Sequence, residues 1–260
     1  MKRLLAIILC VLPLGVMASS GHMALDKADV DLTNKASLQR GFKYFVNYCL
    51  SCHSAGYARY NRVGRDLGIP DKILLENVIF IRDKKNEQLK PGDLMKVTMS
   101  DDYAKDAFGT EPPDLTLVAR VRGADWLYTY LRSFYLDPSR PFGVNNTVFP
   151  NVGMPHVLWE LQGWQALRES HAHGEDEGHD EGAAEEGGHE GPAQLVLVKQ
   201  GVQSPAEYDQ TVRDIVNFLV YLGEPVKLKR QTIGLFVILF LVLFSVLAYF
   251  LKKEYWKDVH

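Results

Sequence analysis

The sequence contains little cysteine and no excess of positive charge. Only three of its 260 residues are cysteines, and only two of these lie close together, so a structural zinc site with two cysteine pairs is excluded. The formal net charge of −3 argues against a general nucleic-acid-binding protein. Hydrophobic residues make up 47% and charged residues 23%, which excludes collagen-like, fully disordered and polytopic membrane proteins. The chain is long enough for one well-packed domain with additional segments.

The first 18 residues have the pattern of a secretory signal peptide. Two basic residues precede an apolar run of roughly 13 residues, and small residues follow it, so we expect cleavage after Ala18. A permanent N-terminal anchor is disfavoured because a helix needs about 20 apolar residues to cross a bilayer. Lipid attachment through Cys10 is disfavoured because the bulky Leu9 precedes it. Cleavage removes Cys10 and leaves two cysteines in the mature chain.

A second apolar run lies near the C-terminus. Ile233–Leu251 contains no charged residue over 19 positions, and as a helix it rises about 28 Å, enough to cross a bilayer. We therefore predict a single transmembrane helix over residues 231–251. Positive charges flank both of its ends, so the positive-inside rule does not determine its orientation. The signal peptide determines the orientation, because it exports the chain that follows it. We therefore expect residues 19–230 outside the cytoplasmic membrane and residues 252–260 inside the cell.

The two remaining cysteines occur in the sequence Cys-Leu-Ser-Cys-His at positions 49–53, which is the pattern for covalent haem attachment. Cys49 and Cys52 can each form a thioether with a porphyrin vinyl group, and His53 can then bind the iron. A redox-active disulfide or half of a zinc site fits less well, because the first leaves His53 unexplained and the second needs more ligands. Export to an oxidising compartment, where c-type haem is normally attached, also favours covalent haem attachment at this motif. We predict one covalent haem c.

Two amphipathic helices are predicted on either side of this motif. The first follows Asn34 as N-cap and delivers the motif at its C-terminal end, as small c-type cytochromes do. The second begins with the capping box Ser204–Glu207, ends near Gly223 and Pro225, and leads directly into the membrane helix. We expect the two helices to pack across each other. The predicted fold is mainly α: a cytochrome c-type haem domain with irregular insertions plus one C-terminal transmembrane helix. The apolar positions at helical spacing in the first helix are Leu38, Phe42, Phe45, Val46 and Cys49.

An electron-transfer haem usually has a second strong iron ligand, and a methionine there raises the reduction potential. We favour Met154, which lies about a hundred residues after His53 between a glycine and a proline that shape its loop. Met95 and Met99 are alternatives that serve equally well as core residues. His156 is the rival ligand for coordination by two histidines.

The order of these features resembles the cytochrome c1 family, in a proteobacterial form, over nearly the whole chain. The haem motif alone indicates only c-type haem, whereas the additional segments make the match specific. The matching features are the signal peptide, Cys49–His53, Pro112–Leu115, Arg120, Arg122, Gly153–Pro155, Ser204–Pro225 and the C-terminal anchor.

The resemblance implies roles for particular residues. Met154 matches the family's sixth iron ligand. Arg122 matches an arginine that pairs with a haem propionate, a bidentate task suited to a guanidinium, and Arg120 is the second candidate. For both arginines the alternative is a solvated surface charge.

Further haem contacts follow from the same resemblance. Pro112 and Pro113 match a segment that lines the histidine side of the haem, where a backbone carbonyl can accept a hydrogen bond from His53 and fix its ring. Trp126 stands where the family often has a tyrosine near the haem. Ordinary core packing is an equally good explanation for Trp126.

The family resemblance also implies a function and partners. It implies a haem subunit of the respiratory quinol:cytochrome c oxidoreductase in the bacterial inner membrane, with its haem domain in the periplasm. The expected partners are cytochrome b, the Rieske iron–sulfur protein, a soluble or membrane-bound cytochrome c as acceptor, and membrane lipid, in a dimeric complex without nucleic acid. No acid–base constellation appears in the chain, so quinol chemistry is expected at cytochrome b. The alternatives are a monohaem subunit of a terminal oxidase or another dehydrogenase, and a haem sensor or metal-storage protein.

One segment, residues 171–191, is strongly acidic. It contains eight acidic residues, four histidines and six glycines, without lysine or arginine. Such a composition predicts a solvated, mobile insert, because it buries too little apolar surface to offset the entropy of ordering. Three roles stay open: a spacer, a metal site through its histidines, or electrostatic steering of a basic cytochrome. Apolar runs at 158–161 and 195–198 predict a hairpin with this insert at its tip.

Overall fold

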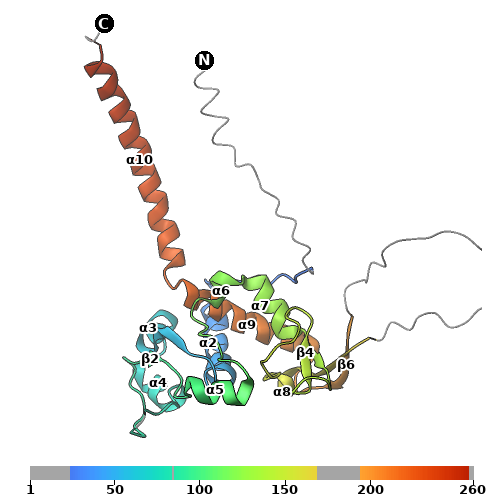
Figure 1. Ribbon diagram of the computed structural model, residues 1–260. Helices are drawn as coiled ribbons and strands as arrows, with labels where there is room; N and C mark the ends of the chain where they lie inside the picture. Colours follow the sequence, from blue (N-terminus) through green and yellow to red (C-terminus); the bar gives the residue numbers. More distant parts are fainter. Residues whose placement is uncertain (1–23, 84, 169–193, 258–260) are drawn as a thin grey trace, which may run out of the picture.

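The computed structural model describes residues 24–83, 85–168 and 194–257. They form a mainly helical body from which one long helix projects, which confirms the predicted fold class (Figure 1). The predicted signal peptide and the acidic insert at 171–191 lie outside the described residues. The elements are α2 (Lys35–Tyr44), η1 (Phe45–Cys49), β1 (Ala55–Arg59), α3 (Tyr60–Leu67), α4 (Asp71–Asn77), β2 (Leu94–Met95), α5 (Asp101–Phe108), α6 (Val118–Val121), α7 (Ala124–Arg132), β3 (Phe134–Leu136), β4 (Val144–Asn146), α8 (Trp159–Gln162), β5 (Gly163–Leu167), β6 (Leu195–Gln200), α9 (Pro205–Gly223) and α10 (Lys227–Tyr255).

Helix α2 carries the haem motif at its C-terminal end, as predicted. The Asn34 side chain accepts a hydrogen bond of 3.0 Å from the Ser37 backbone N–H and caps the helix. The chain then continues as one turn of π-helix, η1, in which the Leu50 N–H bonds the Phe45 carbonyl at 2.9 Å. π-Turns of this kind are frequent at functional sites. Here the turn ends the helix at Cys49, the first residue of the motif.

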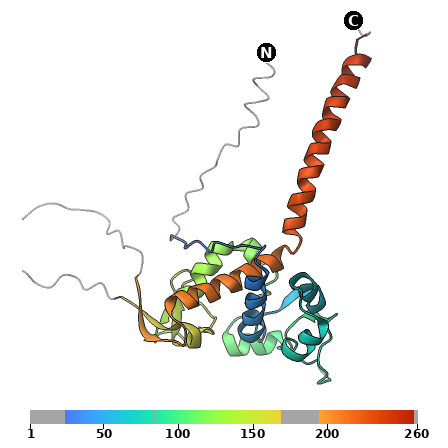
Figure 2. The same cartoon turned by 180° about the vertical axis from the view of Figure 1, so that it is seen from behind.

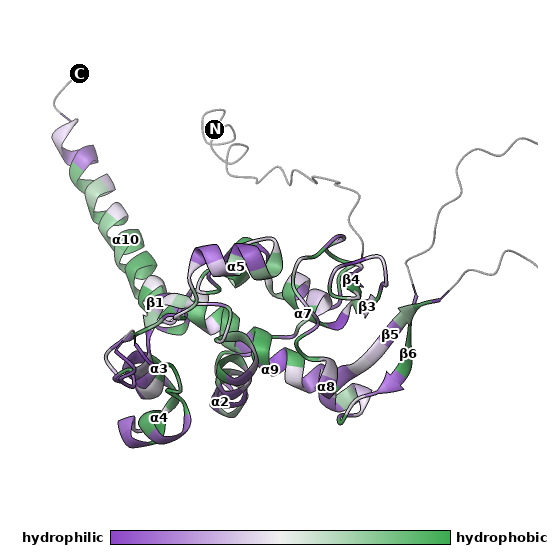
Figure 3. Ribbon diagram, turned by 60° about the horizontal axis from the view of Figure 1, so that its bottom comes forward, coloured by the Kyte–Doolittle hydropathy of each residue, from purple (hydrophilic) through white to green (hydrophobic). Residues whose placement is uncertain are grey.

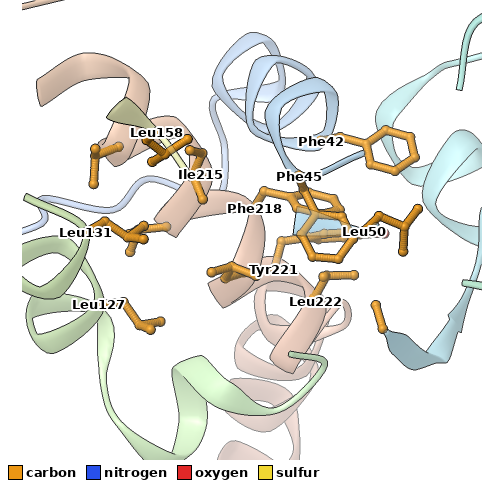
Figure 4. Close-up of a cluster of buried hydrophobic side chains, with 14 of the residues drawn as sticks. Phe42, Phe45, Leu50, Leu127, Leu131, Leu158, Ile215, Phe218, Tyr221 and Leu222 are labelled. Carbon is orange, nitrogen blue, oxygen red and sulfur yellow. The ribbon is translucent and has the colours of Figure 1, made fainter. Parts of the chain in front are cut away.

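Helix α9 crosses α2 and forms the centre of the core. Its predicted capping box is present: the Ser204 side chain accepts from the Glu207 N–H, and the Glu207 side chain accepts from the Ser204 N–H. Figure 4 shows Phe218 of α9 against Phe45, with the two ring centroids 5.5 Å apart. The two helices approach so closely that a Cβ on Gly41 would collide with the Asp214 backbone carbonyl. Glycine is required at this crossing.

A buried polar network also joins the two helices. The Asp214 carboxylate, which is 1% exposed, accepts hydrogen bonds of 2.6 Å from the Ser37 hydroxyl and 2.6 Å from Arg40 Nε. Asn217 Nδ2 donates to the Ser37 hydroxyl at 3.0 Å. Because a buried carboxylate is stable only when it is hydrogen-bonded, this network favours a single register between α2 and α9.

The predicted hairpin is present, but its first strand is β5, at 163–167, and not residues 158–161 as predicted. Strands β5 and β6 pair antiparallel, with Leu167 opposite Leu195 and Gly163 opposite Gln200. Of residues 158–161, predicted as strand, Leu158 caps the short helix α8 and the other three lie within it. Their burial explains the difference: Leu158 and Leu161 are both buried and lie three positions apart, which places them on one side of a helical turn.

Helix α10 extends the predicted transmembrane segment at both ends. It has 29 residues against the 21 predicted, and none of them is buried. Figure 3, coloured by residue hydropathy, shows α10 as mostly hydrophobic, and Figure 2 shows that it continues from α9 after a short connection. The helix is long and apolar enough to cross a bilayer. Only Glu224, Pro225 and Val226 separate it from α9.

Candidate haem site

One cavity of about 440 Å³ is lined by every predicted haem-contact residue except Arg120. It lies between the haem motif, the segment before α6, one face of α7, the loop before α8 and two side chains of α9. Its volume lies in the range typical of ligand and cofactor sites. Its walls include Cys49, Cys52, His53, Pro112, Pro113, Arg122, Trp126, Tyr130, Phe149 and Met154.

Both cysteines of the motif line this cavity as free, half-buried thiols. The Cys52 and His53 N–H groups both bond the Cys49 carbonyl, at 3.1 and 2.8 Å, so the motif forms a tight turn after η1. Burial raises the pKa of the Cys49 thiol to about 12. It is therefore a neutral thiol at pH 7.

The His53 ring is oriented by the proline segment. Its Nδ1 lies 2.8 Å from the Pro113 carbonyl oxygen. Because a carbonyl only accepts, Nδ1 carries the hydrogen, and the Nε2 lone pair remains available to a metal. Burial lowers the pKa of His53 despite the opposing effects of Pro113 and Asp114, so the ring is neutral at pH 7.

Asp114 holds the proline segment against β1. One of its carboxylate oxygens accepts from the Gly56 N–H at 2.6 Å, and the other accepts from the Thr116 N–H at 2.8 Å. A Cβ on Gly56 would lie 2.8 Å from that carboxylate, so glycine allows the close approach. The position of the Pro113 carbonyl, and with it the His53 ring, depends on these contacts.

Met154 lines the same cavity, and its sulfur has a hydrogen-bond donor. The Tyr130 hydroxyl lies 3.3 Å from Met154 Sδ. Burial raises the pKa of Tyr130, so the hydroxyl stays protonated and donates. Sequence reasoning missed Tyr130, although it follows Trp126 at the i+4 spacing that places two side chains on one helix face.

Two asparagines shape the loop that carries Met154. The fully buried Asn146 donates from Nδ2 to the Tyr130 carbonyl at 2.8 Å, and its Oδ1 accepts from the Val148 and Phe149 N–H groups. Asn145 Oδ1 accepts from the Asn151 N–H at 2.8 Å. No motif in the sequence marks these asparagines, because their importance comes from contacts between distant segments.

The two arginine candidates lie in different surroundings. Arg122 borders the cavity, where its guanidinium carbon lies 5.0 Å from the Trp126 ring centroid and 5.8 Å from that of Phe149. Arg120 does not line the cavity; its Cγ would lie 3.1 Å from a Cβ on Gly223, at the end of α9. The geometry therefore favours Arg122 over Arg120 as the residue that faces a ligand in this cavity.

The alternative iron ligands lie elsewhere. His156 is buried and stacks on Phe134 with centroids 4.9 Å apart and an angle of 7° between the planes, and it does not line the cavity. Burial lowers the pKa of His156 to about 4, so it is neutral. Met95 is fully buried in β2, where it pairs with Ala55 of β1. Met99 does not line the cavity either.

The donor set of this cavity fits haem c. Two thiols in a Cys-x-x-Cys-His turn, a neutral imidazole with an available Nε2, a thioether and a guanidinium all border one apolar space. These are the groups that covalent attachment, a His/Met ligand pair and a propionate require.

Comparison with known proteins identifies the family. The family model described as "Cytochrome C1 family" matches residues 27–165 and 191–259, which is most of the chain. The chain belongs to the cytochrome c1 family. Membership in this family implies haem c, a role in electron transport and a membrane anchor, which α10 fits.

Individual relatives match the sequence over nearly the full length of the chain. The chain is 52% identical to cytochrome c1 of Allochromatium vinosum, over 100% of this chain and 99% of that protein. It is 44% identical to the ammonia monooxygenase gamma subunit of Nitrosomonas europaea, over 99% and 97% of the two chains. It is 25% identical to cytochrome c1 of Rhodospirillum rubrum, again over 99% and 97%.

Proposed function

We propose that this chain is the haem-carrying subunit of a quinol:cytochrome c oxidoreductase, the cytochrome bc1 complex. It accepts electrons from the Rieske iron–sulfur protein and passes them to a c-type cytochrome. One observation carries the proposal: a member of the cytochrome c1 family brings two thiols, a neutral imidazole and a thioether to one cavity.

The residues of the cavity divide the work of holding the haem. Cys49 and Cys52 attach it through thioethers, and His53 Nε2 and Met154 Sδ bind the iron. Arg122 binds a propionate with its planar guanidinium. Pro112 and Pro113 border the His53 side, where the Pro113 carbonyl holds the imidazole. Trp126 supports the guanidinium of Arg122 through a cation–π contact.

The bound haem supplies a one-electron couple with a potential raised by the thioether ligand. The chain contributes orientation and an apolar environment, and the bond-making chemistry of quinol oxidation belongs to cytochrome b. Short-lived docking by the two redox partners requires only that the haem edge be reachable from outside the domain.

The proposed location is the bacterial inner membrane. The signal peptide at 1–18 exports the domain at 19–230, α10 anchors it in membrane lipid, and the tail at 252–260 remains in the cytoplasm. With only three residues between α9 and α10, the haem domain is held near the membrane surface. Cytochrome b and the Rieske protein are the proposed neighbours, in a dimeric complex.

A monohaem subunit of a terminal oxidase or another dehydrogenase is a weaker candidate, because such proteins do not require the Pro112–Arg122 segment. That segment is integral to this site, since the Pro113 carbonyl orients His53 and Arg122 borders the cavity. Membership in a monooxygenase assembly is the remaining alternative, and the name of the relative from Nitrosomonas europaea motivates it.

The test is to purify the full-length chain with its membrane assembly in mild detergent. We expect cytochrome b and a Rieske protein to co-elute, and the alkaline pyridine spectrum to be that of thioether-linked haem. Cys49→Ser should reduce covalent haem, whereas Cys10→Ser should leave it unchanged, because Cys10 lies in the signal peptide. An assembly with monooxygenase subunits, or a chain without thioether-linked haem, would refute the proposal.

A further inference from the structure

The strongest unexplained contact in the cavity is the hydrogen bond from the Tyr130 hydroxyl to Met154 Sδ, at 3.3 Å. A thioether is a weak acceptor, and a tyrosine hydroxyl is usually paired with a stronger one when it is buried. Tyr130 is 9% exposed, and in the described part of the chain this is the only hydrogen bond of its hydroxyl. The position of the hydroxyl is therefore matched to the sulfur.

The Tyr130 ring cannot easily turn away from this position. It stacks on Trp126 with centroids 4.9 Å apart and an angle of 9°, and its other neighbour, Phe134, meets it edge-on at 5.3 Å. The Arg122 guanidinium in turn lies over the Trp126 ring. Trp126 and Tyr130 lie four positions apart on α7, so their side chains share one face of the helix, and contacts run from the Arg122 guanidinium through Trp126 and Tyr130 to the sulfur.

The backbone on both sides of the contact is tied together as well. Asn146 Nδ2 donates to the Tyr130 carbonyl, while Asn146 Oδ1 holds the first N–H groups of the loop that leads to Met154. The helix that carries the hydroxyl and the loop that carries the sulfur are thus joined by a second, fully buried contact. Their relative position does not depend on the O–H···S bond alone.

We propose that Tyr130 is a positioning residue that sets the reduction potential through Met154. This inference rests on the proposed role of Met154 as an iron ligand. A thioether sulfur has two lone pairs; the hydroxyl engages one, which directs the other toward the cavity. The hydrogen bond also withdraws electron density from sulfur, so the sulfur stabilises the oxidised iron less than it otherwise would. The reduced state is thereby favoured.

The experiment is a redox titration of the full-length chain in its purified membrane assembly, with Tyr130→Phe as the variant. Phenylalanine keeps the ring and its stacking but removes the donor. At a fixed applied potential the ratio of reduced to oxidised haem should fall by roughly threefold to tenfold, the effect of one hydrogen bond. The sulfur-to-iron charge-transfer band of the oxidised protein should shift, and covalent haem content should not change.

Tyr208→Phe is the matched control. Tyr208 is also buried, and its hydroxyl donates to the Leu131 carbonyl at 2.8 Å, but it does not line the cavity. Loss of the Tyr208 hydroxyl should leave both the haem reduction potential and the charge-transfer band unchanged. A shift in the Tyr208 variant as large as that in the Tyr130 variant would mean a general structural effect and would overturn the inference.

Met154→Leu separates this inference from the proposed function. If Met154→Leu lowers the potential and Tyr130→Phe changes neither potential nor band, the role of Tyr130 is wrong and the iron ligand stands. If neither variant changes the potential, the assignment of Met154 fails, and the inference fails with it.

Discussion

At the scale of single residues, a few hydrogen bonds determine where the chemically important groups lie. Asp114 holds the proline segment to Gly56, and the Pro113 carbonyl in turn orients His53. At the start of α9, Ser204 and Glu207 satisfy each other's backbone N–H groups. Each of these contacts depends on one side chain, so each can be tested by one substitution.

Ser204→Ala should lower the free energy of unfolding by about 1 kcal/mol at neutral pH through loss of the N-cap. The hydrogen bonds from the Ser204 hydroxyl and backbone N–H hold the pKa of Glu207 below its ordinary value of 4.5. A carboxyl whose pKa is lower in the folded state stabilises the fold above its unfolded pKa and loses this effect as the pH falls through its folded pKa. The difference in the free energy of unfolding between wild type and Ser204→Ala should therefore become smaller below pH 4.5. Thermal unfolding over a series of pH values measures this difference.

Ser100→Ala provides the control for this pH dependence. Ser100 caps α5 by accepting from the Tyr103 N–H, but its N3 residue is a tyrosine and not a carboxylic acid. The Ser100 cap should stabilise the fold by a similar amount, but the effect of Ser100→Ala should lack the pH dependence that Glu207 gives to the Ser204 cap. A Ser204 effect that stays constant through the acid range would contradict the coupling to Glu207.

At the scale of elements, the crossing of α2 and α9 supports the haem motif. Phe218 of α9 packs against Phe42 and Phe45, with ring centroids 5.1 and 5.5 Å apart, and Phe45 begins the π-turn that ends at Cys49. A change in the distance between the helices would therefore displace the motif itself. The closest approach is at Gly41, where α2 meets the Asp214 backbone of α9.

Gly41→Ala should destabilise the domain by about 3 kcal/mol, because the added methyl group must separate two packed helices. Denaturant unfolding of the purified protein measures the loss. Gly234→Ala is the control: Gly234 is also helical, but no atom other than its own helix backbone lies within 4 Å of its Cβ position. Equal stability of the Gly41 variant and wild type would show that the crossing is looser than the structure indicates.

At the scale of the whole molecule, the haem domain and the anchor are structurally independent. Helix α10 contributes no buried residue, whereas 12 residues of α9 are buried in the domain. The domain core is therefore complete before the chain reaches Val226. The anchor determines where the domain is held, and it does not determine how the domain folds.

A stop codon after Val226 should release a folded, haem-containing domain into the soluble fraction. A stop codon after Trp256, which retains α10, should leave the protein in the membrane. Cell fractionation followed by haem staining distinguishes the two outcomes. Membrane retention of the shorter chain, or loss of its haem, would contradict the independence of domain and anchor.

Local sequence patterns were sufficient to predict the caps of α2 and α9 and the apolar C-terminal helix, because a cap or a long apolar run acts through residues near one another in the chain. The tertiary structure decided what such patterns leave open. It placed Met154 in the cavity and His156 against Phe134, although the two lie only two positions apart, and it turned Arg122 toward the cavity and Arg120 toward Gly223.

The same physical reason explains the contacts that sequence reasoning missed. The direction of a side chain in a loop or a short helix depends on which distant segment packs against it, and no local pattern records that partner. The hydrogen bond from Tyr130 to Met154 joins residues 24 positions apart, and the Asn146 contact with Tyr130 spans 16. Sequence alone thus determined which chemical groups this protein carries, and the packing of distant segments decided which of them meet.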